Sequence, residues 1–351
     1  MSIHKGLLTP YLVNRLLTEQ EKRNQLHQGQ PHSEHPLVYE DDTVIKMNST
    51  YLETVDRHYS VKGYPSLFSF VLFVTILVIT IYGCSVTFDR YFFQHNPLNS
   101  KRIFAMSIAL ICIFFSLCFL SKIFLKEWFR KTHYPIRFNR KNQMVYVYQV
   151  DGTVLSASWK KVFFTPYEGK LGIPGWGIDG HILADDQETV LRTFSLGFYG
   201  DKDDMIGYWE FIRCYMEEDV LDDLSKTIFI CPPIAEKKES YLFGLQYSFR
   251  FASKLEWYQL LFLPYTLLEC LSRYIAMQTS KIPQWPEEIE ISCKVASDDK
   301  IDVSYKNNIQ CLWRYTLANL KTEDYIMLHK QRKTAAKRIK RKVIARVIGK
   351  Y

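Results

Sequence analysis

The sequence lacks the short motifs by which many metal-dependent and nucleophile-dependent enzymes are recognised. It has no H-E-x-x-H, no nucleophile elbow and no dinucleotide-binding glycine fingerprint after a strand. Its eight cysteines form no C-x-x-C pair and no zinc-like spacing. This pattern is typical of reduced thiols and argues against a zinc site and against a disulfide framework. We therefore predict a non-enzymatic protein with no metal and no cofactor.

Charge is also missing from two long apolar runs. Ser66–Phe88 and Ile103–Leu120 contain no Asp, Glu, Lys or Arg. A helix needs about 20 apolar residues to cross a hydrocarbon core about 30 Å thick, and it satisfies its own backbone groups there. The runs therefore predict a transmembrane helical hairpin over 65–125. Two buried core helices are the alternative, but soluble helices rarely run this long without a charge.

Cations beside the runs indicate the orientation of the hairpin. They precede the first run or follow the second: Arg57, Lys62, Lys122, Lys126, Arg130 and Lys131. The positive-inside rule then places both termini in the cytoplasm. The connector carries Arg90, Lys101 and Arg102, which weakens this asymmetry, although cationic side chains at a helix end can snorkel to the interface.

Short strands and turns follow the hairpin and predict a β-rich cytoplasmic domain with a capping helix over 130–230. The expected strands are 134–138, 144–150, 153–159, 162–167, 181–184 and 190–196. An amphipathic helix is expected over 202–218. Antiparallel strands closed by a C-terminal helix resemble the pleckstrin-homology-like barrel. The fold class is thus an α+β membrane protein with an antiparallel cytoplasmic domain.

The N-terminal segment, 1–64, is predicted to be cytoplasmic. Leu8, Leu12 and Leu16 share one face of an expected short helix, and a linker follows it. The linker holds His27, His32 and His35. No carboxylate or cysteine lies at a compatible spacing, so we expect no metal site there.

The region 240–320 is predicted to combine helices with a β-hairpin. The run 257–268 indicates a buried or interfacial helix kinked at Pro264, with a third or re-entrant span within 257–276 as the alternative. Beyond Pro286, apolar and polar residues alternate, which predicts a hairpin with one exposed face. The apolar residues of its first strand are Ile289, Ile291, Cys293 and Val295.

A glycine-rich segment over 169–180 holds the first candidate site. It lacks the G-K-[ST] ending of a phosphate loop, and a strand rather than a helix is expected after it. We predict a turning loop on which Trp176 is exposed and contacts a partner, together with Asp179 and His181. An acid–base role for these two residues with Asp185 and Asp186 is the enzymatic alternative.

The C-terminal tail, 321–351, holds the second candidate site. The chain carries a net charge of +8, and the ten Lys or Arg residues of Lys330–Tyr351 account for all of it. As a helix, the tail has an apolar face with Ile339 and Val343, which is typical of a helix lying on an anionic leaflet. The candidate lipid-surface residues are Lys337, Arg338, Lys340, Arg341, Lys342 and Arg346. A solvated tail and nucleic-acid binding are alternatives, but no recognition fold accompanies the charges, so no nucleic acid is expected.

The run Tyr134–Lys141, Y-P-I-R-F-N-R-K, is followed by Val145–Val147, the Asp151-Gly152 turn and Trp159. In these motifs the chain resembles an uncharacterised bacterial family of two-span inner-membrane proteins with a P-I-R-F-N-R-like cytoplasmic domain. Such proteins are often encoded near type VI secretion and Rhs toxin genes. The resemblance covers roughly 60–230 and carries no catalytic residues. It implies a multi-pass protein of the bacterial inner membrane.

The hypothesis that follows is an immunity or accessory protein that binds a toxin or effector in bacterial competition. A membrane-tethered module that binds lipid or a signal is a second hypothesis, and a membrane-active effector is a third. The sequence leaves the identity of the partner and the oligomeric state open.

Overall fold

The computed structural model describes residues 2–4, 10–31, 40, 42–92, 100–169, 175–251, 261–308 and 321–348. The chain forms two compact units that interleave along the sequence. The first, here called the sheet unit, comprises Met1–Ser60, Thr132–Glu239 and Ile282–Tyr351. The second, the helical unit, comprises Val61–Lys131 and Ser240–Lys281. This division differs from the expected order of domains, because the N-terminal segment and the basic tail both belong to the sheet unit.

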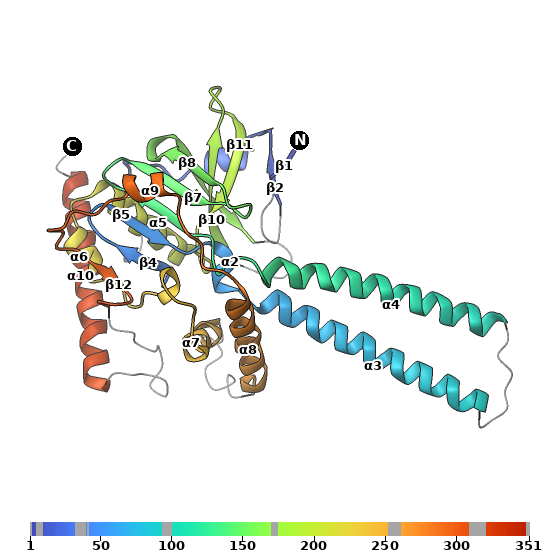
Figure 1. The fold of residues 1–351 in the computed structure, drawn as a ribbon. Coiled ribbons are helices and arrows are strands. Elements are labelled where there is room, and N and C mark those ends of the chain that lie inside the picture. The colour runs from blue at the N-terminus through green and yellow to red at the C-terminus, as the bar shows by residue number, and fades with distance from the viewer. Residues whose placement is uncertain are drawn as a thin grey trace. The chain divides into compact units, whose positions relative to one another are not determined.

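The sheet unit contains two larger antiparallel sheets and a two-stranded one, in which β1 pairs with β2 (Figure 1). The six-stranded sheet has the order β12-β4-β5-β6-β7-β8, and the four-stranded sheet has the order β3-β11-β10-β9. The strands are β1 Ser2–His4, β2 Tyr11–Val13, β3 Arg15–Leu16, β4 Val44–Met47, β5 Tyr51–Thr54, β6 Ile136–Asn139, β7 Met144–Tyr148, β8 Val154–Ser158, β9 Val162–Glu168, β10 Trp176–Leu183, β11 Thr189–Ser195 and β12 Val303–Ser304. The predicted α+β class with antiparallel sheets is confirmed.

The core of the sheet unit is built around large aromatic rings. Trp159 stacks on Trp209 with ring centroids 5.6 Å apart, and Phe164 lies 4.9 Å from Trp209. Trp209 belongs to α5, Lys202–Glu217; this helix is buried at every residue from Met205 to Met216, more than the single apolar stripe that its helical spacing predicts. The remaining short helices of this unit are α1 Glu19–Arg23, α2 Arg57–Ser60, α6 Leu221–Ser225, α9 Glu287–Ser292 and the 3-10 turns η1 Trp159–Lys161 and η2 Pro233–Ala235.

The basic tail forms a long helix, α10, Thr322–Ile348. Its apolar face is buried in the sheet unit, where Ile339 and Val343 join the main core. This corrects the expectation of a helix with its apolar face on a leaflet, because that face is already covered by protein. The sequence predicts an amphipathic helix equally well in both settings, since lipid and core are both apolar.

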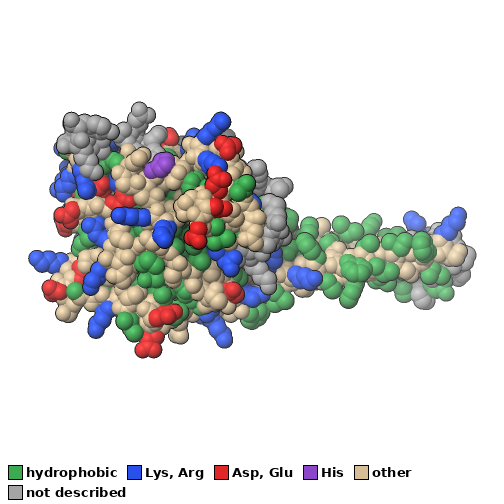
Figure 2. Space-filling model, turned by 90° about the horizontal axis from the view of Figure 1, so that it is seen from above, with side chains coloured by type: hydrophobic (Ala, Val, Ile, Leu, Met, Phe, Trp, Pro, Cys, Tyr) green, Lys and Arg blue, Asp and Glu red, His purple; other side chains and the backbone are tan. Residues whose placement is uncertain are grey.

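The helical unit contains α3 Tyr64–Phe92, α4 Ser100–Glu127, α7 Tyr241–Phe251 and α8 Leu263–Thr279. Within the described residues, α3 and α4 are long and apolar enough to cross a membrane, with a mean hydropathy of 2.5 in each. Hydrophobic side chains cover this pair in Figure 2, with cationic side chains near its ends. These helices match the predicted hairpin.

The two ends of the hairpin are joined by one buried carboxylate. Glu127, at the end of α4, accepts hydrogen bonds from the backbone N–H groups of Gly63 and Ser66, each at 2.9 Å, and from the Ser66 hydroxyl. A carboxylate is favourable at the start of a helix because it satisfies orphan N–H groups and meets the positive end of the helix dipole. We call this junction the hairpin root.

Several local predictions are wrong. The first part of the expected strand at Ile289–Val295 is the helix α9, which begins after Pro286; Ile289 and the capping residue Cys293, four residues apart, are buried on one side. Ile291 is 67% exposed, which a helix explains and alternation does not. The expected helix through Leu12 and Leu16 is instead β2 and β3, and Leu8 lies outside the described residues.

The predicted helix at 257–268 is described only from residue 261 onward. Here Pro264 lies in the first turn of α8 and not at a kink within it. Proline is tolerated at this position because its missing N–H would have no partner in the helix.

Ile339→Ala tests the packing of α10. Because the side chain is fully buried, we expect the free energy of unfolding of the solubilised chain to fall by about 2–4 kcal/mol. Lys337→Ala, on the exposed face of the same helix, should change it by less than about 0.5 kcal/mol. Urea unfolding followed by tryptophan fluorescence measures both, and equal effects would contradict the packing of this helix in the core.

Candidate functional site

Two pairs of polar residues face each other across β10 and β11. Asp179 lies opposite Ser195, and His181 lies opposite Thr193. The Ser195 hydroxyl donates to Asp179 Oδ1 at 2.5 Å, and the His181 Nδ1 and Thr193 Oγ1 atoms are 2.8 Å apart. Because side chains alternate along a strand, these four share one face of the four-stranded sheet, while Ile178 and Phe194 are buried in the core.

The N-terminal segment covers this polar face. The Tyr11 hydroxyl lies 2.9 Å from Ser195 Oγ, and Glu21 Oε1 lies 3.5 Å from His181 Nε2. Arg15 holds Glu21 with hydrogen bonds of 2.6 and 2.8 Å, and Thr18 forms a capping box with the same carboxylate. As a result His181 is 1% exposed, so it is not the surface residue that the sequence predicted.

Burial and hydrogen bonding shift the two carboxylates of this cluster in opposite directions. Burial raises the pKa of Asp179, and His181 and Ser195 oppose that shift. For Glu21, burial also acts upward, but the nearby His181 and the hydrogen bonds from Arg15 and Thr18 outweigh it and hold the pKa well below its ordinary value. Ser195 thus bonds to Asp179 and His181 to Thr193, and Asp185 and Asp186 of the enzymatic alternative lie in an exposed turn.

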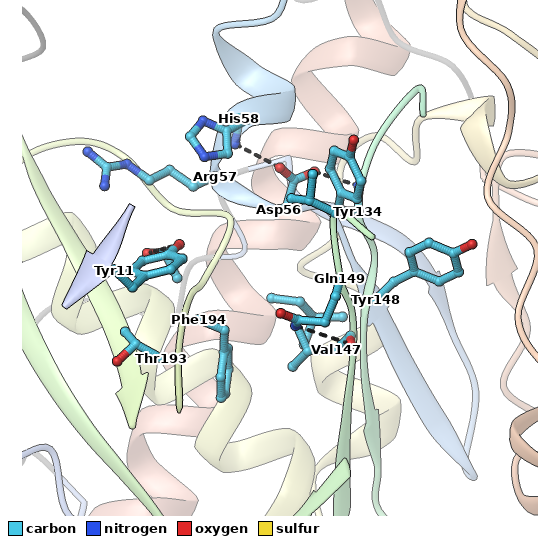
Figure 3. A pocket seen from close by; sticks show the side chains of 13 residues that line it. Tyr11, Asp56, Arg57, His58, Tyr134, Val147, Tyr148, Gln149, Thr193 and Phe194 are labelled. Carbon is cyan, nitrogen blue, oxygen red and sulfur yellow. Dashed lines mark hydrogen bonds between the residues drawn. The ribbon is translucent and has the colours of Figure 1, made fainter. Parts of the chain in front are cut away.

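A small cleft of about 50 Å³ lies beside this cluster, between the two larger sheets (Figure 3). Asp56 lies at its side, where its carboxylate accepts hydrogen bonds from the backbone N–H groups of His58 and Tyr134. Arg57 and Tyr11 lie on the other side in Figure 3. The volume is far below the roughly 300–1,000 Å³ of a metabolite site and suits one side chain or a few waters.

Aromatic rings and cations gather at the start of β10. The Arg57 guanidinium lies 4.7 Å from the centre of the Tyr167 ring, and Lys202 Nζ lies 5.1 Å from the centre of the Trp176 ring. Tyr199 completes the group, and burial raises its pKa to about 12 against the opposing charge of Arg57. We name these five residues, Arg57, Tyr167, Trp176, Tyr199 and Lys202, the aromatic–cation patch.

Two glycines allow the rings to lie against β10. A Cβ atom at Gly177 would come within 2.3 Å of the Tyr167 hydroxyl, and one at Gly175 would come within 2.7 Å of the Tyr199 ring. Trp176 is half-buried between them and bonded through its backbone to Gly200. The glycines of this segment thus leave room for the Tyr167 and Tyr199 rings, and no phosphate loop is seen in its described part. The sequence signal for this patch was Trp176 between glycines.

A second polar network was not foreseen. Arg213 on α5 is completely buried and binds Glu210 at 2.8 Å and Glu218 at 2.9 Å. Glu218 also binds Arg346 of the basic tail. Burial acts to raise the pKa of Glu218, but the two arginines outweigh it and lower the pKa. This network joins α10 to α5 and is structural. Its sequence signal was the spacing of Arg213 from Glu210 and Glu217, three and four residues away on one helix.

The candidate lipid-surface residues of the tail divide into two groups. Arg338 and Lys342 pair with Asp223, and Arg346 pairs with Glu218. Lys337, Lys340 and Arg341 form no ion pair with a described residue, and Lys337 and Arg341 are exposed. A lipid-binding role for these cations stays a prediction.

The described part of the chain contains no cluster of three or more His, Cys, Asp or Glu side chains that could hold a metal ion. Of the linker histidines, His32 and His35 lie outside the described residues.

Comparison with known families finds one match, to a family of unknown function, DUF6708, over residues 109–297. The match covers more than half of the chain and runs from within α4 to just beyond α9. The chain belongs to this family. No curated protein and no solved structure matches it. Membership in DUF6708 assigns no activity, so the function has to be inferred from the geometry.

Asp179→Asn tests the buried cluster, because asparagine keeps an oxygen that accepts from Ser195 and cannot ionise. The raised pKa means that the folded chain binds this proton more tightly than the unfolded chain. Native stability therefore falls as the pH rises above about 4. We expect the variant to melt at a higher temperature than the wild type at about pH 7, with the gain shrinking toward pH 4.

Thermal melts of the solubilised chain across this pH range make the comparison. Asp185→Asn, in an exposed turn, is the control and should melt like the wild type at every pH. A gain for Asp179→Asn that does not depend on pH would show that ionisation of this residue has no part in stability.

Proposed function

We propose that the protein is a non-enzymatic protein of the bacterial inner membrane that binds a protein partner, as an immunity or accessory protein for a toxin of a type VI secretion system. One combination carries the proposal: two long, exposed apolar helices and, in the same chain, a folded unit with an aromatic–cation patch. The first element suits anchoring in lipid, and the second suits recognition of a protein.

Membrane anchoring is supported by the exposure of the hairpin. In the 18-residue apolar stretch of each helix, only 11% of α3 and 6% of α4 is buried, whereas the core helix of a soluble protein would be mostly buried. Six cations flank the hairpin at its two ends and three lie in the connector: Arg57, Lys62, Lys122, Lys126, Arg130 and Lys131 against Arg90, Lys101 and Arg102. This asymmetry supports an orientation with both termini in the cytoplasm.

Binding by the sheet unit is supported by the composition of its patch. Trp, Tyr and Arg dominate the binding energy of protein interfaces, because the two aromatic side chains bury a large area with few rotatable bonds and the Arg guanidinium forms several directed hydrogen bonds. The strand order supports the pleckstrin-homology-like interpretation: a meander β5-β6-β7-β8 precedes the three strands β9, β10 and β11, and α5 follows.

A non-enzymatic role is supported by the state of the chemically capable residues. Asp179, Ser195, His181 and Thr193 bond to one another beneath the N-terminal segment. A general base or nucleophile needs a path to substrate, and these side chains are instead used to attach the first strands to the sheet.

A membrane-tethered lipid- or signal-binding module is the second candidate. It is favoured by the exposed cations of α10, Lys337 and Arg341. Flotation of the full chain does not separate the two functions, because the hairpin binds any bilayer. Lys337→Glu with Arg341→Glu should therefore leave protection from a toxin intact under the first proposal and abolish signal or lipid recognition under the second.

Co-expression tests the proposed function directly. Toxins encoded beside this gene are expressed in a sensitive bacterium with and without the full chain. We expect one of them to be neutralised and to co-purify with the chain from membranes in mild detergent. Failure of every neighbouring toxin both to be neutralised and to co-purify would remove the immunity and accessory roles.

Substitutions in the aromatic–cation patch should weaken that complex. Trp176→Ala removes the largest ring, and we expect a loss of affinity of about tenfold or more. Lys202→Glu reverses an exposed charge and should reduce affinity without affecting folding. Ile291→Ala, an exposed apolar residue of the same unit, is the control and should bind like the wild type. Unchanged affinity in both patch variants would place the partner elsewhere.

A further inference from the structure

The helix α8 is reversed in polarity compared with a helix on the surface of a water-soluble protein. Its exposed side chains are apolar or aromatic: Pro264, Tyr265, Leu267, Leu268, Leu271 and Tyr274. Its two charged residues point inward, with Arg273 only 1% exposed and Glu269 partly buried. The residues just before it, Leu261 and Phe262, are exposed as well. A helix on the surface of a soluble protein shows the opposite arrangement: its leucines face the core and its charged side chains face the water.

The surroundings of α8 within the helical unit show where this apolar face belongs. Ser272 donates a hydrogen bond to the Gly63 carbonyl at 2.8 Å, and the Ser280 hydroxyl donates to the Glu127 carbonyl at 3.2 Å. A Cβ atom at Gly63 would come within 2.4 Å of the Arg273 backbone, so these two segments of the backbone are in direct contact. Figure 1 shows α8 beside the start of α3. The helix is therefore attached to the hairpin root.

The length and attachment of α8 argue for a position along the membrane surface and not across it. Its 17 residues span about 25 Å, somewhat less than a hydrocarbon core of about 30 Å. Ser272 on α8 and Ser280, which caps the end of α8, lie about two turns apart, yet both bond at the hairpin root. A helix running alongside α3 into the bilayer would move away from the root over that distance. The two ring-bearing residues Tyr265 and Tyr274 suit the headgroup zone.

We propose that α8 is a third membrane-contacting element, which lies in the lipid interface beside the hairpin root with Leu267, Leu268 and Leu271 in the acyl boundary. This inference rests on the proposed membrane anchoring. Cations at the root, among them Lys126, Arg130 and Lys281, are exposed and suit anionic headgroups at the same level. The interface helix fixes the hairpin at two points and so limits its tilt.

Lipid quenching of a fluorescent probe tests the proposal on the full chain. The exposed cysteines of α3 and α4, Cys84, Cys112 and Cys118, and also Cys311, are changed to Ala. Single cysteines then replace Leu268, Ile108 in α4 or Lys300 in an exposed turn, and each carries a bimane. The chain is reconstituted in vesicles of phosphatidylcholine and phosphatidylglycerol, with either brominated acyl chains or iodide in the buffer as quencher.

We expect the brominated lipid to quench the probe at positions 268 and 108 and not at position 300. Bromines near the headgroup should quench position 268 more strongly than bromines near the end of the acyl chain, and the order should be reversed at position 108.

Quenching of position 268 by iodide would overturn the proposal and place α8 in water. Protection of position 268 from both quenchers would also overturn it and indicate that another part of the protein covers α8. Strongest quenching of position 268 by the deep bromines would replace the interface helix with a re-entrant one. Loss of lipid quenching at position 108 would overturn the membrane anchor itself, so the two failures are distinguishable.

Discussion

The pairing of β5 with β6 is the constraint on which the rest of the structure depends. Four residues of β5 pair in register with four of β6, from Tyr51 opposite Asn139 to Thr54 opposite Ile136. In the sequence, the whole apolar hairpin lies between these neighbouring strands. Any insertion there must leave and return within one strand spacing, about 5 Å. An antiparallel helical hairpin satisfies this condition because its two ends lie side by side, and Glu127 holds them together at the root.

The sequence predicts an element well where one periodicity dominates and neighbours in the chain are neighbours in space. The meander from β6 to β8, the turn at Asp151-Gly152, the helix α5 and both apolar helices belong to this class. The strands β4 and β5 were missed because they are short and because the partner of β5 follows only after the hairpin. For α9, Ile289 and Cys293 fit a helical face as well as a strand face, and Pro286 decides the outcome.

The candidate site was only partly predictable for a related reason. Trp176 was found because a large ring between glycines is unusual in a sequence. Lys202, which lies over the Trp176 ring, follows strands β9 to β11 in the sequence, and Arg57, which lies over the Tyr167 ring, precedes them, so no local pattern connects the patch. The burial of His181 depends on Glu21, and the burial of Ile339 depends on α6 and the core that α10 packs against. The pattern of polar and apolar residues predicts which side chains will be buried, but not which distant segment of the chain will bury them.

Because β5 and β6 flank the spans in the sequence, the order of synthesis limits the order of folding. When β4 and β5 leave the ribosome, the strand that completes their sheet has not yet been made. Both apolar helices must be synthesised before β6 can reach β5. Until then β5 exposes an open edge that can pair with other chains. A nascent chain that pauses before β6 is made would thus be prone to aggregate at the ribosome exit, and a chaperone that shields this edge would raise its yield.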